Sequence, residues 1–215
     1  MHKLVQLTDC HLLADCAADY KGVNPSRSLK QVCEHIAEHH PDTGLLVLTG
    51  DLSQDESVES YTRLCSLVSQ FKVPVYALPG NHDNLQNMRV AFGDKIEINQ
   101  SIVLEPWKIH LLNSTVPGET AGMLGASELD RLQQQLRLHS DAPSLIALHH
   151  HPVIIGSDWM DRLGLRNADA LLSILHCHQQ VKAVLFGHIH QAFHHRQGSI
   201  TYLGTPSTCV QFKPN

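Results

Sequence analysis

The chain has 215 residues, of which 42% are hydrophobic and 17% charged, a composition that supports one folded domain and excludes an intrinsically disordered protein. Its formal net charge of −5 disfavours a non-specific nucleic-acid binder, which carries a basic surface, but is compatible with a small anionic substrate because bound metal reverses the local charge. No run approaches the roughly 20 apolar residues of a membrane span, and the N-terminus lacks a signal-peptide pattern, so we expect a cytoplasmic protein without membrane contact.

The first half of the chain predicts alternating strands and helices. Apolar runs predict strands over Leu4–Thr8, Leu45–Leu48 and Val73–Leu78. Helical periodicity predicts helices over Ser28–His40 and Glu56–Phe71. This β-α-β-α-β order implies parallel strands joined by right-handed crossovers.

The second half contains further strands and two more helices. Helices are expected over Ser127–Leu138, with Ser127 as the cap, and over Ala168–Leu175. The expected β-type segments are Ile102–Leu104, Trp107–Leu112, Ser144–Leu148, Val181–Phe186, Ile200–Leu203 and Thr208–Phe212. No repeat, low-complexity tract or linker interrupts them, so residues 1–215 are predicted to form one α/β domain of two packed sheets flanked by helices.

Cysteine and histidine usage narrows the kinds of site. The six cysteines include no Cys-x-x-Cys pair, which argues against a zinc knuckle or a thioredoxin-type motif. A chain of this length also needs no disulfide framework. The 17 histidines are unusual; several are interpreted as exposed helical residues and His110 as structural, whereas others cluster after predicted strands.

Five polar signatures directly follow predicted strands: Asp9-Cys10-His11, Gly50-Asp51, Gly80-Asn81-His82-Asp83, His149-His150-His151-Pro152 and Gly187-His188-Ile189-His190. Because ligands bind at the carboxyl ends of strands in open α/β sheets, we expect these signatures to converge on one place. Residues i and i+2 of an extended segment point to the same side, so each Asp-x-His or His-x-His pair can offer two donors to one pocket. Gly50, Gly80 and Gly187 are expected to let the backbone turn sharply before the donors.

The types and number of donors indicate two metal ions. Carboxylate, amide and imidazole groups without thiolate suit Mn, Fe or Zn. A single zinc ion takes about four ligands, so a larger set suggests two ions that share a bridging carboxylate. The alternative is structural: Asp9 and Asp51 could cap turns, and His188 and His190 could be hydrogen-bonded core residues. The candidate donors are Asp9, His11, Asp51, Asn81, one of His149, His150 and His151, and His188 and His190.

The ordered signatures resemble those of the calcineurin-like metallophosphoesterase superfamily from residue 9 to residue 190. The segments Leu165–Ala168 and Thr205–Pro214 are further similar to the bacterial class III 3′,5′-cyclic-AMP phosphodiesterases. The resemblance implies a four-layer α/β/β/α sandwich of two mixed sheets flanked by helices, with two divalent metal ions (Fe, Mn or Zn). It implies hydrolysis of 3′,5′-cyclic AMP to 5′-AMP by a metal-bridging hydroxide. Relatives continue with more strand after Lys-Pro, so an end at Asn215 is expected to reflect a trimmed or a naturally short chain.

The resemblance also implies a ligand set. His150 is chosen among three neighbours because family members commonly read His-His-Pro here with the first histidine as ligand, which leaves His149 and His151 as neighbours. Asp51 is then the bridge. Carried over by motif, the first ion takes Asp9, His11, Asp51 and His190, and the second takes Asp51, Asn81, His150 and His188.

His82 is the predicted catalytic residue, since it adjoins the candidate ligand Asn81 yet is left over when the donors are counted. We expect it to donate a proton to the leaving 3′ oxygen. Many relatives carry an acid three residues after the bridging Asp; that position is Gln54 here and the nearest acid is Asp55, so the partner of His82 stays open. The substrate-binding residues are expected to be His11, Asp51, Asn81, His82 and His190.

Other functions stay open. Trp159 and Asp161 lie in a loop that either covers a nucleobase or is a simple surface loop. A different metallophosphoesterase is the main alternative: a nucleotide or lipid pyrophosphatase, a 2′,3′-cyclic phosphodiesterase, a protein phosphatase, or a nuclease, the last disfavoured by the acidic charge. An inactive metal-binding module is the alternative of a different class. Metal identity, base preference and oligomeric state are not indicated by the sequence.

Overall fold

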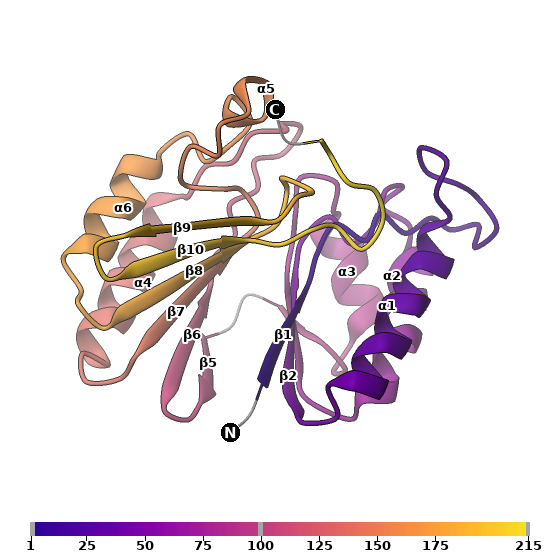
Figure 1. Cartoon of the computed structure of the whole chain (residues 1–215), viewed down its shortest axis with the longest axis horizontal. Helices are drawn as coiled ribbons and strands as arrows, with labels where there is room; N and C mark the ends of the chain where they lie inside the picture. The colour runs from indigo at the N-terminus through magenta and orange to yellow at the C-terminus, as the bar shows by residue number, and fades with distance from the viewer. Residues whose placement is uncertain (1–2, 99–100, 214–215) are drawn as a thin grey trace.

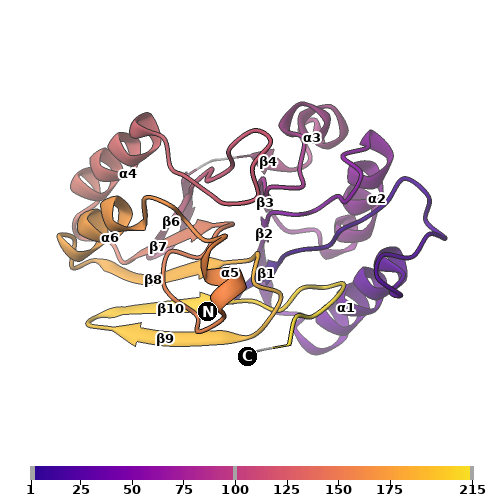
Figure 2. The ribbon, with the colours of Figure 1, turned by 90° about the horizontal axis from the view of Figure 1, so that it is seen from above.

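The computed structural model describes residues 3–98 and 101–213. They form two sheets packed face to face, with helices on both outer faces (Figures 1 and 2), which confirms the predicted α/β arrangement. The strands are β1 (Lys3–Leu7), β2 (Thr43–Thr49), β3 (Val75–Leu78), β4 (Glu97–Ile98), β5 (Ser101–Leu104), β6 (Trp107–Leu111), β7 (Ser144–Leu148), β8 (Val181–Phe186), β9 (Phe193–Gln197) and β10 (Ile200–Gly204). The helices are α1 (Pro25–His39), α2 (Val58–Val68) with a 3₁₀ turn η1 (Ser69–Phe71), α3 (Leu85–Phe92), α4 (Ala126–Leu138), α5 (Asp158–Asp161) and α6 (Ala168–His176).

The two sheets differ in strand direction. The four-stranded sheet has the order β1-β2-β3-β4, and all of its pairs in the described residues are parallel. The six-stranded sheet has the order β5-β6-β7-β8-β10-β9, with antiparallel pairs at both edges. The mixed character expected of both sheets therefore holds for the six-stranded sheet only. The reason is connectivity: α1, α2 and α3 each link consecutive strands of the four-stranded sheet, and such crossovers give parallel pairs.

Side chains of β2 alternate between the two faces of its sheet, so this strand contributes to two separate hydrophobic cores. Leu46 and Leu48 pack into the core shared with α1 and α2, whereas Leu45 and Val47 face the other sheet and meet Ile109 of β6. All are buried, so the continuous apolar run of this strand is accounted for by burial on both faces. A third core lies between the six-stranded sheet and the helices α4 and α6. These layers bring the carboxyl ends of β1, β2, β7 and β8 to the same side of the molecule (Figure 1), and β3 runs parallel to β2.

Helix ends differ from the sequence-based expectation where caps decide them. Helix α1 begins at Pro25 instead of Ser28, because the Asn24 side chain accepts a hydrogen bond from the Arg27 backbone N–H at 2.8 Å and Pro suits the first helical position. Helix α4 begins one residue before Ser127, whose predicted capping role is wrong. Helices α3 and α5 and strands β4 and β9 were not among the predicted elements.

The segment Thr208–Phe212, predicted as β-type, contains no strand. Its backbone hydrogen bonds instead join it to the loops after β1 and β8: the Thr208 N–H donates to Thr8 O at 3.1 Å, and the Phe212 N–H donates to His190 O at 3.0 Å. This segment therefore forms backbone hydrogen bonds with two loops and not with a neighbouring strand. No helix in the described part of the chain has both the length and the apolar character needed to cross a bilayer.

His110 on β6 predicts a measurable acid sensitivity of the fold. Its ring is 1% exposed, and burial followed by the charge of Arg131 lowers its pKa to about 4. Between pH 6.5 and 4 the unfolded chain therefore binds a proton that the folded chain excludes, so stability falls as the pH falls. In His110→Phe, the loss of unfolding free energy between pH 7 and 4.5 is expected to be smaller than in wild type by roughly 2 kcal/mol.

Urea unfolding of both proteins at the two pH values measures this difference. The other buried histidines add the same pH dependence to both proteins, so their effect cancels in the comparison. The exposed His194→Gln is the matched control and should follow the wild type. An identical pH dependence in wild type and His110→Phe would contradict the prediction.

Candidate metal centre

The loops after β1, β2, β3, β7 and β8 meet at one point between the two sheets. Backbone hydrogen bonds tie them together: Asp9 N–H donates to Gly50 O at 2.9 Å, His11 N–H to Asp51 O at 2.9 Å, and Gly187 N–H to His149 O at 3.1 Å. The expected convergence of the five signatures is thus seen in the structure.

The donors are aimed by an unusual backbone, and not by extended alternation as expected. Asp9, His11, Asp51, His188 and His190 all have φ between 46° and 67°. Such left-handed values are uncommon outside glycine and cost about 1–3 kcal/mol each, and they cluster at functional sites. In both the Asp-x-His and the His-x-His pair the donors are therefore directed by left-handed turns just beyond the strand ends.

The main role of the glycines in the signatures is to let neighbouring loops pack closely, and not to supply a turn. Only Gly50 of the three has a left-handed φ, at 91°. A Cβ atom at Gly80 would overlap the Asp51 carboxylate, and one at Gly187 would overlap the Thr8 hydroxyl. A side chain at either position would push donor-bearing loops apart.

The first donor group consists of Asp9, His11, Asp51 and His190, all buried. The Nε2 atoms of His11 and His190 are 3.1 Å apart, and His190 Nε2 is 3.2 Å from Asp9 Oδ1. His11 Nε2 is 3.9 Å from Asp51 Oδ2. Ligands bound at about 2.0–2.2 Å from one ion lie roughly 3 Å from one another, so this spacing suits coordination to a shared metal.

The Nδ1 protons of the two histidines in the first group point away from the other donors. His11 Nδ1 donates to Gln54 Oε1 at 2.8 Å, and His190 Nδ1 donates to Val210 O at 2.7 Å. Burial lowers the pKa of His11 to about 4, so its ring is neutral at pH 7. The inner Nε2 of His11 then carries a lone pair that faces His190 Nε2 and the Asp51 carboxylate. Imidazole nitrogens and two carboxylates gathered in a buried space form a suitable set of ligands for a cation.

The second donor group contains His149, His188, Asn81 and Asp51. His149 Nδ1 donates to Thr49 O at 2.9 Å, which directs Nε2 inward. His149 Nε2 lies 3.3 Å from Asp51 Oδ2, 3.2 Å from Asn81 Oδ1 and 3.2 Å from His188 Nδ1. Asp51 therefore takes part in both groups, as a bridging carboxylate would.

His150, the expected ligand, is directed elsewhere. Its Nε2 donates to Thr120 O at 3.0 Å, and its Nδ1 accepts from the Ser114 hydroxyl at 2.8 Å. A nitrogen of His150 lies within 4.8 Å of the donor atoms of His149 and His188, but both of its ring nitrogens already have protein partners. This arrangement favours His149 over His150, the choice made from the sequence, as the inward donor.

The third histidine of the run, His151, faces the loop that carries α5. Its Nε2 lies 3.6 Å from Asp161 Oδ1. It is therefore a neighbour of the donor groups, as expected, and not a member of them.

A family model for calcineurin-like phosphoesterases matches residues 2–192. The chain belongs to this family. This phosphoesterase is 41% identical over 211 residues to the 3′,5′-cyclic adenosine monophosphate phosphodiesterase CpdA of Pseudomonas aeruginosa, covering 98% of this chain and 78% of the relative. It is 39% identical to a 3′,5′-cyclic-nucleotide phosphodiesterase of Nostoc sp., with 98% and 79% covered. A dimetal phosphatase from Danio rerio shares the fold at a TM-score of 0.75 and 14% identity, with 98% and 88% covered.

The position of His82 in this phosphoesterase fits a residue beside the metal donors. Its backbone N–H donates to Asp51 Oδ1 at 2.8 Å, and its ring lies edge-on to His11 with centroids 5.3 Å apart. Gln54 bonds His11, and Asp55 accepts from the Ala14 and Ser57 N–H groups. Gln54 therefore orients the candidate donor His11, and neither Gln54 nor Asp55 has a described hydrogen bond to His82.

A cavity of about 160 Å³ lies over the donors of the phosphoesterase. Its floor includes donors of both groups and the ring of His82, and its rim comes from four separate segments. Asn81 also borders an adjoining hollow of about 570 Å³ on the side of α3. The rim residues are Tyr20, Lys21, Thr120, Trp159, Met160, Leu163 and Phe212.

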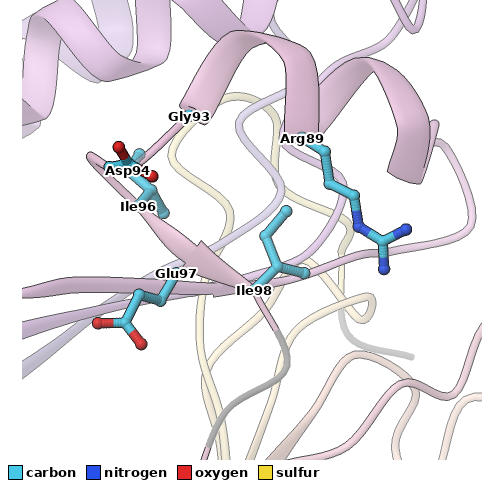
Figure 3. A pocket seen from close by; sticks show the side chains of 6 residues that line it. All are labelled: Arg89, Gly93, Asp94, Ile96, Glu97 and Ile98. Carbon is cyan, nitrogen blue, oxygen red and sulfur yellow. The ribbon is translucent and has the colours of Figure 1, made fainter.

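A separate hollow of about 500 Å³ lies away from the donors, beside α3 and β4. Its residues 93–96 precede β4, so it lies at the amino end of a parallel strand, opposite the ends that carry the donors. Figure 3 shows the Arg89 and Glu97 side chains pointing away from each other. Among its described lining residues there is no histidine, so it does not resemble the donor groups: Arg89, Gly93, Asp94, Ile96, Glu97 and Ile98.

Proposed function

We propose that this chain hydrolyses 3′,5′-cyclic AMP to 5′-AMP with a pair of divalent metal ions. The observation that carries the proposal is the shared carboxylate of Asp51, which lies 3.3 Å from His149 Nε2 in one donor group and 3.9 Å from His11 Nε2 in the other. The names of the curated relatives support a cyclic nucleotide as the substrate.

The donors are assigned to two ions. When bound, such ions neutralise phosphate charge and lower the pKa of a water, which supplies the nucleophile for attack on phosphorus. The nitrogen and oxygen donors suit Fe, Mn or Zn. One ion would be held by Asp9, His11, Asp51 and His190, and the other by Asp51, Asn81, His149 and His188.

The protein's own groups hold protons away from the ions. Gln54, Val210 and Thr49 accept the Nδ1 protons of three donor histidines, so each Nε2 faces inward, toward the other donors. Burial lowers the pKa of His149, but the Asp51 carboxylate outweighs this effect and raises it to about 9. A proton on His149 therefore occupies the position that the second ion would take.

The test is product identification with purified, Mn²⁺-loaded protein. Formation of 5′-AMP from 3′,5′-cyclic AMP, abolished by a chelator, supports the proposal. Parallel assays use 2′,3′-cyclic AMP, a dinucleotide and bis-p-nitrophenyl phosphate. Hydrolysis of these esters without hydrolysis of 3′,5′-cyclic AMP rejects the substrate, and inactivity towards all of them with metal bound rejects the enzyme.

His82→Ala should keep both ions and lower the turnover of 3′,5′-cyclic AMP by roughly a hundredfold. The reason is that the leaving ribose 3′ oxygen needs a proton, which we assign to His82 at the edge of the donor groups. A p-nitrophenolate leaving group needs no proton, so bis-p-nitrophenyl phosphate should lose much less. Equal losses with both substrates would contradict the role of proton donor.

A further inference from the structure

The rim of the donor cavity carries an exposed tryptophan that no step above uses. Trp159 lies in α5 and is 46% exposed, although it lines the same cavity as His82 and Asn81. A large indole held at the mouth of a polar cavity offers a flat apolar face next to a charged floor. This combination suits a ligand with a planar ring at one end and an anionic group at the other.

The loop that carries Trp159 is held in one shape. The Asp161 carboxylate accepts hydrogen bonds from the backbone N–H groups of Ile155, Gly156 and Ser157 at 2.8, 3.1 and 3.0 Å. The same carboxylate lies 3.6 Å from His151 Nε2, which ties the loop to the strand end that bears His149. The backbone that carries the indole is therefore held in place before any ligand binds, which lowers the entropic cost of binding.

The other aromatic rings of the rim already have stacking partners. Tyr20 stacks on His11 with centroids 5.0 Å apart, and Phe212 stacks on His190 at 4.2 Å and 7°. The Lys21 ammonium lies over both rings, 5.5 Å from the Tyr20 centroid and 5.1 Å from the Phe212 centroid. Trp159, by contrast, meets Phe212 edge-on, at 5.2 Å and 68°.

The Lys21 position is fixed by a tight turn. Tyr20 and Val23 exchange two backbone hydrogen bonds of 2.8 and 3.0 Å, and Lys21 and Gly22 between them have φ of 49° and 81°. These are the features of a type I′ hairpin turn, in which lysine is disfavoured at the first central position. The Lys21 ammonium, which lies over Tyr20 and Phe212, adds positive charge to the rim.

We propose that Trp159 is the stacking platform for the nucleobase of the substrate, while the phosphate lies among the metal donors. The cavity, at about 160 Å³, is smaller than the roughly 300 Å³ that encloses a small-molecule ligand, so the rest of a nucleotide must lie along the rim. Stacking on an aromatic ring accepts any base, because every base has a π face. The identity of the ligand as a nucleotide rests on the proposed function.

Binding measurements distinguish the contribution of the base to the affinity from that of the phosphate. Calorimetric titrations of Mn²⁺-loaded protein compare 5′-AMP with ribose 5-phosphate, which has the same sugar and phosphate but no base. In wild type, 5′-AMP should bind roughly 5- to 100-fold more tightly. Trp159→Ala should weaken 5′-AMP alone and bring the two affinities close together, and Trp159→Phe should retain much of the preference.

Ile154→Ala is the matched control, since Ile154 is an apolar residue of the same loop, 82% exposed and outside the cavity lining. It should keep the wild-type ratio of affinities. If Trp159→Ala leaves the ratio unchanged, or weakens both ligands equally, Trp159 is not a base platform. Both titrations are independent of turnover, so a wild type that binds 5′-AMP through Trp159 but does not hydrolyse 3′,5′-cyclic AMP refutes the proposed reaction and not this inference.

Discussion

Asp51→Asn is expected to lower the turnover of 3′,5′-cyclic AMP by roughly a thousandfold or more and to reduce bound metal below two ions per chain. Asp51 is the carboxylate that belongs to both donor groups, at 3.3 Å from His149 Nε2 and 3.9 Å from His11 Nε2. Burial by itself raises its pKa, but the facing His149 outweighs burial and holds the pKa of Asp51 well below its usual range. An amide keeps the shape of the side chain but cannot offer this charge to two ions.

Asparagine is the informative replacement because Asp51 has a φ of 50°. Asparagine tolerates this left-handed conformation, so the loop is expected to stay in place. Asp94→Asn, in the hollow beside β4, is the matched control and should keep both metal and activity. Metal content per chain, measured by mass spectrometry of the digested protein, decides the matter: two ions retained in Asp51→Asn would refute the bridge.

The layered fold could be predicted because its central strands carry a strong local signal. Residues 45–48 and 184–186 are buried apolar runs, and both lie in central strands with neighbours on each side. The elements that were missed depend on partners distant in sequence. Strand β4 has two residues and exists through pairing with Tyr76 and Ala77, and the mostly exposed β9 exists through pairing with β10.

The donors could be predicted from residue type and position, but their directions could not. His149, His150 and His151 are adjacent, similar in chemistry and all buried. What separates the first two is the position of Thr49 O beside one ring, and of Thr120 O with the Ser114 hydroxyl beside the other. Such partners come from other loops and leave no local pattern.

The same reasoning applies to Gln54. In the sequence it reads as the loss of an expected acid, whereas in the fold its side-chain oxygen accepts the Nδ1 proton of His11 at 2.8 Å. A neutral amide can fix the ring and its tautomer without adding a further negative charge to a site that already holds Asp9 and Asp51. Which histidine Gln54 orients depends on the fold and cannot be read from spacing alone.

His149→Ala and His150→Ala are expected to separate the two histidines by metal content. His149→Ala removes the nitrogen that lies 3.3 Å from Asp51 Oδ2 and 3.2 Å from Asn81 Oδ1, so the second ion should be lost and turnover should fall roughly a hundredfold or more. His150→Ala should retain two ions. Its cost should appear as roughly 1–3 kcal/mol of lost stability, because the partners of its ring, Thr120 O and the Ser114 hydroxyl, lose a hydrogen bond.

Metal analysis and urea unfolding of the two variants give the answer together. Both rings have 0% exposure and both follow β7, so a generic effect of hollowing the core should be similar in the two proteins. A selective loss of one ion in His149→Ala therefore reports the direction of the ring and not its burial. The reverse pattern, with metal lost only from His150→Ala, would restore the ligand that the family resemblance implied and would require the ring of His150 to leave Thr120 when the second ion binds.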